Sequence, residues 1–221
     1  MRPDRGSVLL VALGIAAVVD LGALALGIPA GHTVAKPVLM PLLAAYAHTR
    51  GAPRPLVAAL LFGWGGDVLL LFDAEPAFLA GMGSFALGHV CYLVLFGRFG
   101  KPGRLAYAAG YGLALVVAVA SLWPGLPADL RLPVAGYSAL LTTMAWAAAR
   151  LGLVAGLGGA LFVVSDMLIA TGVAAWPQPP RPDLWIMLTY LAAQYLLVRG
   201  VLGSPGERQA ATPAYRAANP V

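Results

Sequence analysis

The chain has 221 residues, of which 60% are hydrophobic and only 10% are charged, and its mean hydropathy is +0.83. A water-soluble domain of this length cannot bury so much apolar surface, so the composition excludes one and predicts an all-α polytopic membrane protein. The net charge of +5 does not indicate nucleic-acid binding, because the basic residues lie between hydrophobic runs and at the chain ends.

Eight apolar runs follow one another along the chain, with only short turns between them. Because about 20 apolar residues span a bilayer, we interpret them as eight transmembrane helices, with the second and sixth short. The expected helices lie near residues 7–28, 33–48, 55–72, 77–97, 103–122, 132–149, 153–175 and 183–202. Residues 1–203 thus form a single transmembrane domain, and we expect the polar residues 204–221 to form a disordered cytoplasmic tail.

The basic residues indicate how the helices are oriented. If the helices alternate in direction, one side carries Arg2, Arg5, Arg50, Arg54, Arg98, Lys101, Arg104, Arg150, Arg199, Arg208 and Arg216, and the other only Lys36, Arg131 and Arg181. The positive-inside rule then predicts a multi-pass protein of the cell membrane with both termini in the cytoplasm. The first run is too long for a usual signal peptide, and Asp20 interrupts it.

Two aspartates, Asp67 and Asp166, lie inside apolar runs. A carboxylate near the bilayer centre costs about 2.5–3.5 kcal/mol even on the mildest insertion scale, so an acid at such a depth marks a functional site by default. The structural alternative is a buried, protonated acid bonded to backbone carbonyls. We interpret both aspartates as candidate catalytic residues.

Further polar side chains lie in the same runs and are expected to converge with the aspartates on one cavity that opens outward. The i, i+3 pair His89 and Tyr92 and the i, i+4 pair Tyr190 and Gln194 each share a helix face. The candidates are His89 for catalysis and Lys36, Tyr92, Tyr137, Tyr190 and Gln194 for substrate binding. Alternatively, His89 is a packing residue, the tyrosines are interhelical bridges, and Asp20 pairs with Lys36 to fasten two helices.

A weak internal repeat relates the two halves of the chain. Lys36-Pro37-Val38 is echoed by Leu132-Pro133-Val134, and Leu61-Phe62 with Gly66-Asp67 is echoed by Leu161-Phe162 with Ser165-Asp166. Four helices separate each pair, so a parallel 4+4 duplication is possible, with the two aspartates as counterparts.

At these residues the chain resembles the YhhN family of lysoplasmalogenases. The resemblance runs from about residue 33 to 202. It lies in Lys36-Pro37, Phe62 to Asp67, Gly88-His89 with Tyr92, Pro133-Val134 with Tyr137, Leu161-Phe162 with Ser165-Asp166, and Tyr190 with Gln194. Gly63-Trp64-Gly65 departs from the serine-containing approach expected before the first aspartate. The resemblance implies an eight-helix membrane hydrolase that cleaves the vinyl ether bond of lysoplasmalogens, which are lysophospholipids with an alkenyl chain, to a fatty aldehyde and glycerophosphoethanolamine or glycerophosphocholine.

The candidate residues suit this reaction, because vinyl ether hydrolysis needs an acid to protonate carbon and a base to stabilise the resulting cation. We expect one of Asp67 and Asp166 to donate the proton while the other stays ionised and orients the water, with His89 or a tyrosine assisting. Lys36 either binds the substrate phosphate or holds an aspartate ionised. The scheme requires no metal or organic cofactor.

Other functions remain open on the sequence alone. Paired acids, a midplane histidine and an internal repeat also occur in proton-coupled transporters of small molecules or lipids. A hydrolase acting on another lipid and a structural scaffold are further alternatives. The sequence does not indicate the oligomeric state, the preferred headgroup or which aspartate is the acid.

Overall fold

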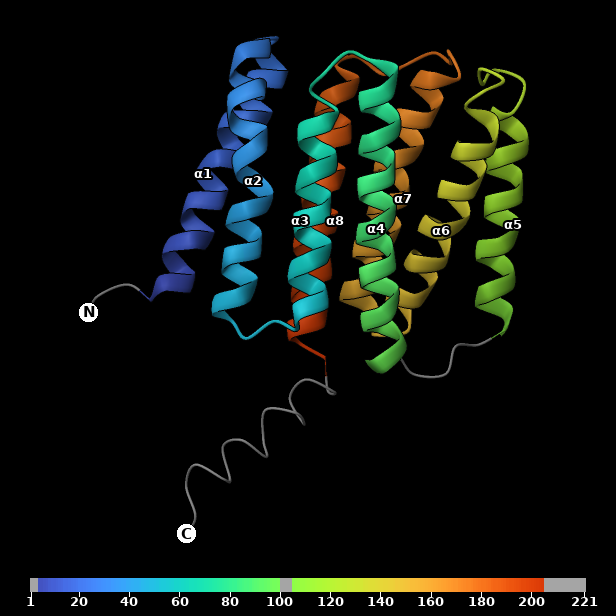
Figure 1. Cartoon of the computed structure of the whole chain (residues 1–221). Helices are drawn as coiled ribbons and strands as arrows, with labels where there is room; N and C mark the ends of the chain where they lie inside the picture. The colour runs from blue at the N-terminus through green and yellow to red at the C-terminus, as the bar shows by residue number, and fades with distance from the viewer. Residues whose placement is uncertain (1–3, 100–104, 205–221) are drawn as a thin grey trace.

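The computed structural model describes residues 4–99 and 105–204, and every regular element in these ranges is an α-helix. The elements are α1 (Arg5–Leu26), α2 (Pro29–Thr49), α3 (Arg54–Leu69), α4 (Glu75–Phe99), α5 (Leu105–Leu122), α6 (Arg131–Ala149), α7 (Leu153–Val173) and α8 (Pro182–Leu202). They stand side by side as an up-and-down bundle, with α1 and α2 at one end of the array and α5 at the other (Figure 1). The predicted tail beyond Ser204 lies outside the described residues.

The order of the helices matches the sequence prediction, but the two helices expected to be short are not: α6 has 19 residues, more than α3 or α5, and α2 is longer still. The second helix was expected to be short and to begin near residue 33, but α2 begins at Pro29 and has 21 residues. The turn-forming sequence Pro29-Ala30-Gly31 concealed this start, because proline is well tolerated in the first turn of a helix. The shortest helix among the described residues is instead α3, with 16 residues.

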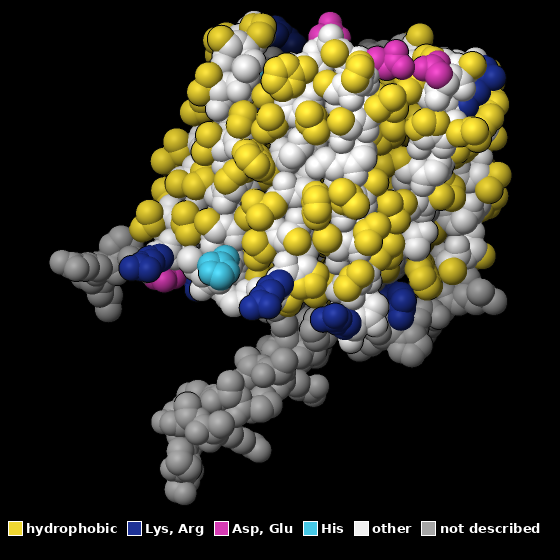
Figure 2. Space-filling view, in the orientation of Figure 1, with side chains coloured by type: hydrophobic (Ala, Val, Ile, Leu, Met, Phe, Trp, Pro, Cys, Tyr) yellow, Lys and Arg dark blue, Asp and Glu magenta, His cyan; other side chains and the backbone are white. Residues whose placement is uncertain are grey.

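The surface between the two ends of the bundle is apolar, as expected for contact with lipid (Figure 2). Five of the described helices are long and apolar enough to cross a membrane, namely α1, α4, α6, α7 and α8. Their exposed side chains include Val11, Ile15 and Val18 of α1, which are 62–72% exposed. The chain is therefore a multi-pass membrane protein.

Charged residues gather at the two ends of the bundle, with most of the basic side chains at one end and most of the acidic ones at the other (Figure 2). The end near the N-terminus carries Arg5, Arg50, Arg54, Arg98, Arg150 and Arg199 among the described residues. The acidic residues Asp73, Glu75, Asp129 and Asp183 lie at the opposite end, together with Arg131 and Arg181.

Close helix approach depends on glycines of α4 and α7. A Cβ atom added at Gly88 of α4 would lie 3.1 Å from the Ala59 carbonyl oxygen of α3, and one added at Gly158 of α7 would lie 2.9 Å from the Leu197 amide nitrogen of α8. Backbones approach this closely in membranes where small residues line the interface. The pairs α3–α4 and α7–α8 are thereby drawn together, which holds the helices of the polar core in register.

A side chain compensates for a break in the hydrogen bonding of α2. Pro41 has no N–H, so the carbonyl of Pro37, four residues earlier, loses its partner within the helix. The indole Nε1 of Trp64 on α3 donates to that carbonyl at 2.9 Å. Since a bare carbonyl is costly in hydrocarbon, this bond both satisfies α2 and ties it to α3.

Candidate functional site

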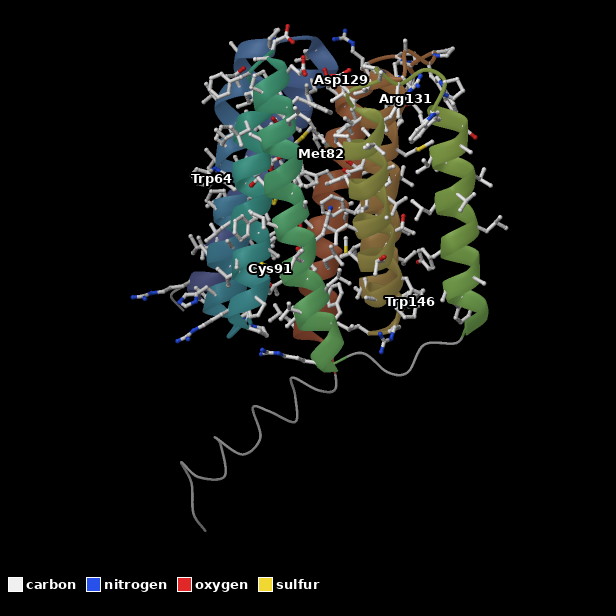
Figure 3. All side chains as sticks on the ribbon, turned by 45° about the vertical axis from the view of Figure 1, so that its right-hand side comes forward. Trp64, Met82, Cys91, Asp129, Arg131 and Trp146 are labelled. Carbon is white, nitrogen blue, oxygen red and sulfur yellow. The ribbon has the colours of Figure 1, made fainter. Side chains whose placement is uncertain are left out.

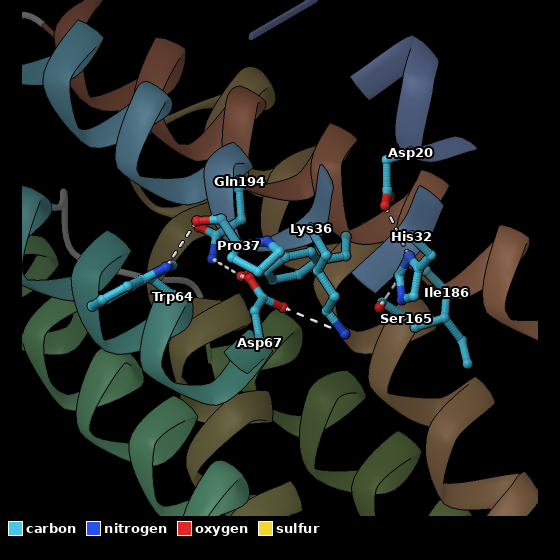
Figure 4. A network of polar contacts seen from close by, with 10 residues as sticks. Asp20, His32, Lys36, Pro37, Trp64, Asp67, Ser165, Ile186 and Gln194 are labelled. Carbon is cyan, nitrogen blue, oxygen red and sulfur yellow. Dashed lines mark hydrogen bonds and ion pairs between the residues drawn. The ribbon is translucent and has the colours of Figure 1, made fainter. Parts of the chain in front are cut away.

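Asp67 lies near the end of α3 and is almost fully buried, with 3% of its surface exposed. Its Oδ1 atom lies 4.0 Å from Nζ of Lys36 on α2, and its Oδ2 atom accepts a 2.8 Å hydrogen bond from the Tyr190 hydroxyl on α8. Figure 4 shows Lys36 turned toward this carboxylate. A cation and a hydroxyl donor thus compensate for the burial of one carboxylate.

The Asp67 cluster continues through Gln194 to α4. The amide Nε2 of Gln194 donates to the Tyr190 oxygen at 3.3 Å, and its Oε1 accepts a 2.6 Å bond from the Tyr92 hydroxyl. Tyr92, Tyr190 and Gln194 are all at most 3% exposed. The structure thus brings Tyr92, Tyr190 and Gln194 together with Asp67.

Asp166 of α7 belongs to a second cluster. Its Oδ2 atom accepts a hydrogen bond from the Tyr137 hydroxyl of α6, and Nε2 of His89 on α4 lies 3.1 Å from the same hydroxyl. Because the one hydroxyl proton of Tyr137 points to Asp166, Nε2 of His89 must carry its own proton to complete the bond. The buried Nδ1 of His89 is then a bare acceptor, and it has no hydrogen-bond partner among the described residues.

Aromatic rings connect the two clusters. The Phe162 ring packs edge-on against His89, with centroids 4.8 Å apart, and against Tyr190, with centroids 5.5 Å apart. Phe85 contacts both Phe162 and Tyr190 in the same manner. The Asp67 and Asp166 clusters therefore share one apolar partition rather than a direct polar contact.

A cavity of about 240 Å³ lies among α4, α5, α6 and α7. Asp166 and Tyr137 line it, whereas Asp67, Lys36 and Tyr190 do not. Most of the remaining wall is apolar; Met82, labelled in Figure 3, is on the α4 side of the wall. Of the residues expected to share one cavity, the structure places only Asp166 and Tyr137 on this one.

Asp20 does not pair with Lys36, contrary to the structural alternative drawn from the sequence. Its Oδ1 atom bonds Nδ1 of His32 at 2.8 Å, and Lys36 turns to Asp67 instead (Figure 4). The sequence prediction missed His32 because residues 29–32 were read as a turn, whereas His32 lies on α2 one helical turn before Lys36. Asp20 and His32 still fasten α1 to α2.

Phe85 escaped the sequence prediction, and Phe162 entered it only within the Leu161-Phe162 motif and not as a site residue. Both are aromatic residues in apolar helices. Residue type alone does not distinguish side chains that separate two acids from side chains of an ordinary core. In the described part of the chain, no three His, Cys, Asp or Glu side chains come together as a metal site.

Comparison with known proteins relates the chain to one family and to several of its members. The YhhN family matches residues 31–201, which include every candidate residue of both clusters. The lysoplasmalogenase TMEM86B of Homo sapiens is 38% identical over 159 residues, and the match covers 70% of this chain and 66% of that protein. TMEM86B of Rattus norvegicus is 36% identical, with 77% of this chain and 72% of that protein covered.

A bacterial relative extends the similarity. The lysoplasmalogenase of Mycobacterium tuberculosis is 33% identical over 213 residues, which cover 85% of this chain and 80% of that protein. No solved structure matches the chain significantly. On the match of its residues 31–201, the chain belongs to the YhhN family.

Proposed function

We propose that this protein is a membrane-embedded lysoplasmalogenase. It hydrolyses the vinyl ether bond of lysoplasmalogens and releases a fatty aldehyde with glycerophosphoethanolamine or glycerophosphocholine. Its family and the names of its relatives support this activity and favour it over a proton-coupled carrier. The observation that carries the mechanism is that Asp166, bonded to Tyr137, faces an apolar cavity suited to an alkenyl chain.

The reaction begins when Asp166 donates a proton to the β-carbon of the vinyl ether, which leaves an oxocarbenium ion at the α-carbon. Water adds to the α-carbon and loses a proton, so that a hemiacetal forms. The hemiacetal then breaks its bond to the glycerol oxygen, which takes up a proton and leaves as an alcohol, while the alkenyl chain leaves as an aldehyde. The overall reaction consumes one water and no cofactor.

The surroundings of the two aspartates support a division of roles. Lys36 lies beside Asp67, and such an ion pair favours the charged carboxylate. Among the described residues Asp166 has no cation at ion-pair distance, and its bonding partner is the neutral Tyr137. Asp166 is therefore the candidate acid, and Asp67 is the candidate carboxylate whose negative charge stabilises the cation across the aromatic partition.

His89 and Tyr137 supply a proton route to Asp166. The chain of hydrogen bonds runs from His89 Nε2 through the Tyr137 hydroxyl to Asp166 Oδ2, so a proton lost to the substrate can be replaced along it. His89 gives up its Nε2 proton only as its Nδ1 takes up another, which balances the proton that the added water loses. In this scheme His89 restores the acid and does not contact the substrate.

Lys36 is better placed to hold Asp67 ionised than to bind the substrate phosphate. Its Nζ atom turns toward Asp67, and only 8% of the residue is exposed. A phosphate ligand would have to displace that carboxylate or share the ammonium group with it.

We further infer that all eight described helices cross the membrane of the cell, with both termini in the cytoplasm. The arginine-rich end near the N-terminus supports this orientation through the positive-inside rule. We also propose the parallel 4+4 repeat, on the matched positions of Asp67 in α3 and Asp166 in α7.

Asparagine variants test the function. The purified Asp166→Asn and Asp67→Asn proteins should release no aldehyde from a lysoplasmalogen, because an amide neither donates a carboxyl proton nor carries a charge. The Asp183→Asn variant is the matched control, since this exposed residue lies in the first turn of α8, away from both clusters. Wild-type activity in either cluster variant would contradict the two-acid mechanism.

A further inference from the structure

Three hydroxyl groups line the cavity and have no part in either aspartate cluster. Ser138 and Thr142 lie on α6, four residues apart and so on one helix face, and Tyr111 lies on α5. Each is partly exposed, and the cavity supplies that space. None of the three hydroxyls makes a hydrogen bond to another described residue.

Other hydroxyls on these helices behave differently. Thr143, the neighbour of Thr142, donates to the Ala139 carbonyl oxygen of its own helix at 2.7 Å, and Ser121 of α5 bonds the Val117 carbonyl oxygen at the same distance. In membrane helices the hydroxyls of serine and threonine usually make such hydrogen bonds to backbone carbonyls of their own helix. Ser138 and Thr142 forgo this bond, so their donors and acceptors are available to a ligand in the cavity.

Two of the hydroxyls, those of Thr142 and Tyr111, lie on one side of Asp166, and Ser138 is at its depth. Ser138 directly follows Tyr137, the partner of Asp166, and Thr142 lies about 6 Å further along the α6 axis. Helices α5 and α6 are antiparallel. Tyr111 lies 11 residues before the end of α5 and Thr142 lies 11 residues after the start of α6, so the two are at the same depth in the bundle. On the other side of Asp166 the wall is apolar, with Phe78, Leu122 and Val173. This polarity matches a molecule with an apolar tail on one side of the reacting bond and hydroxyl-bearing carbons on the other.

We propose that Ser138 and Thr142, with Tyr111 opposite them, bind the glycerol of the substrate through its free 2-hydroxyl and so determine specificity. This inference rests on the proposed function. In a lysoplasmalogen the 2-hydroxyl is only a few bonds from the vinyl carbon that takes the proton. Ser138 and Thr142 are correspondingly close to Tyr137, which is bonded to the acid Asp166. A site that hydrogen-bonds a substrate hydroxyl discriminates against an analogue without it, because its own polar groups are then left unpaired.

The test compares two substrates and four proteins. The substrates are a lysoplasmalogen and its 2-deoxy analogue, in which hydrogen replaces the hydroxyl. The proteins are wild type, Ser138→Ala, Thr142→Val and the matched control Thr143→Val, whose hydroxyl is already bonded to its own helix. The measurement is kcat/KM for aldehyde release by each pair.

Wild type and Thr143→Val should prefer the lysoplasmalogen about tenfold, the value of one neutral hydrogen bond. Thr142→Val and Ser138→Ala should each lose much of this preference, because the hydroxyl that they can no longer bind is the one that the analogue lacks. The ratio of the two kcat/KM values does not depend on the fraction of folded enzyme, so partial misfolding of a variant cannot imitate the result.

An unchanged tenfold preference in both Ser138→Ala and Thr142→Val would overturn the inference, as would equal activity of wild type on the two substrates. Either outcome leaves the proposed function intact, since wild type still releases aldehyde. Failure of wild type to release aldehyde from either substrate would instead contradict the proposed function.

Discussion

Asp67 and Asp166 are the same residue type in two different environments. Asp67 is sealed between Lys36 and Tyr190, whereas Asp166 has a tyrosine partner and faces the cavity. Pairs of acids in unlike surroundings commonly divide the roles of proton donor and charged stabiliser. The same division is expected in this protein, and single side chains can test it.

Removing the charge of Lys36 should slow the reaction without weakening substrate binding. In Lys36→Met the buried Asp67 loses its cation and can no longer remain charged at low cost. We expect kcat to fall at least about tenfold and KM to change little. Steady-state kinetics of aldehyde release give both constants, with the exposed Arg54→Met as the control cation. A raised KM with unchanged kcat would show that Lys36 binds the phosphate.

His89 should be replaceable in part by a residue that keeps an N–H donor. The His89→Phe variant removes the bond to Tyr137, and we expect kcat to fall about 100-fold, in the range typical of lost proton transfer. His89→Gln can still donate to the Tyr137 oxygen and should be faster than His89→Phe. Equal rates for the two variants, with equal thermal stability in detergent, would show that the donor has no role.

At the scale of the residue, the sequence singled out the polar residues of the two clusters but not their arrangement. Asp67, Asp166 and their polar partners are conspicuous in apolar runs, because polar groups at that depth are costly. Their division into two clusters depends on how far apart the helices stand, and on Phe85 and Phe162 between them. No spacing along one helix encodes that distance.

Two close contacts between helices help to hold the candidate site in place. The bond from Trp64 to the Pro37 carbonyl holds α2 against α3 close to the Lys36–Asp67 pair. Gly63 has a related role on the other face of α3, since a Cβ atom there would lie 3.0 Å from the Tyr190 hydroxyl oxygen.

A double-mutant cycle tests the compensation for Pro41. Trp64→Phe should destabilise the protein by about 1 kcal/mol, since the Pro37 carbonyl loses its donor in lipid. Pro41→Ala supplies a backbone N–H to that carbonyl, so Trp64→Phe should cost less in this background. Thermal or denaturant unfolding in detergent measures both differences. Equal costs in the two backgrounds would rule out the compensation.

Gly63→Ala should reduce activity through crowding of the Asp67 cluster. The added methyl group would press on Tyr190 and Gln194, so we expect aldehyde release to slow about tenfold as the cluster shifts. Gly83→Ala is the matched control, because a Cβ atom at Gly83 of α4 meets nothing within 4 Å. It should keep full activity and equal or greater stability, as alanine favours helix. Similar losses in both variants would contradict this role of Gly63.

At the scale of the element, apolar runs and turn residues predicted the order and approximate bounds of all eight described helices. The early start of α2 was missed because proline and glycine mark both turns and first helical turns. The bond between Trp64 and Pro37 was missed because it joins residues of different helices.

For the whole molecule, the difference in charge between the two ends predicts its orientation. In a Cys91→Ser background, a cysteine at Ala74 should react with a membrane-impermeant maleimide added to intact cells. A cysteine at Thr49, exposed at the arginine-rich end, should react only after permeabilisation. The reverse pattern would place the termini outside and overturn the orientation, without bearing on the chemistry.

At this scale composition predicted a membrane protein and the apolar runs predicted its helices, and the structure confirms the helices. It did not predict that the cavity lies among α4, α5, α6 and α7 and excludes Asp67. The position of a cavity depends on how helices splay apart, which the hydrophobic pattern of single helices does not encode.

Every role proposed for these residues depends on one step, in which an acid within the bundle protonates the vinyl ether carbon. The most direct measurement is mass spectrometry of the aldehyde that the purified wild-type protein releases from a lysoplasmalogen in D2O. We predict one deuterium on the carbon next to the aldehyde group, above the exchange seen in a sample of free aldehyde kept under the same conditions. Release of no aldehyde by folded protein, or of aldehyde without that deuterium, would contradict the account.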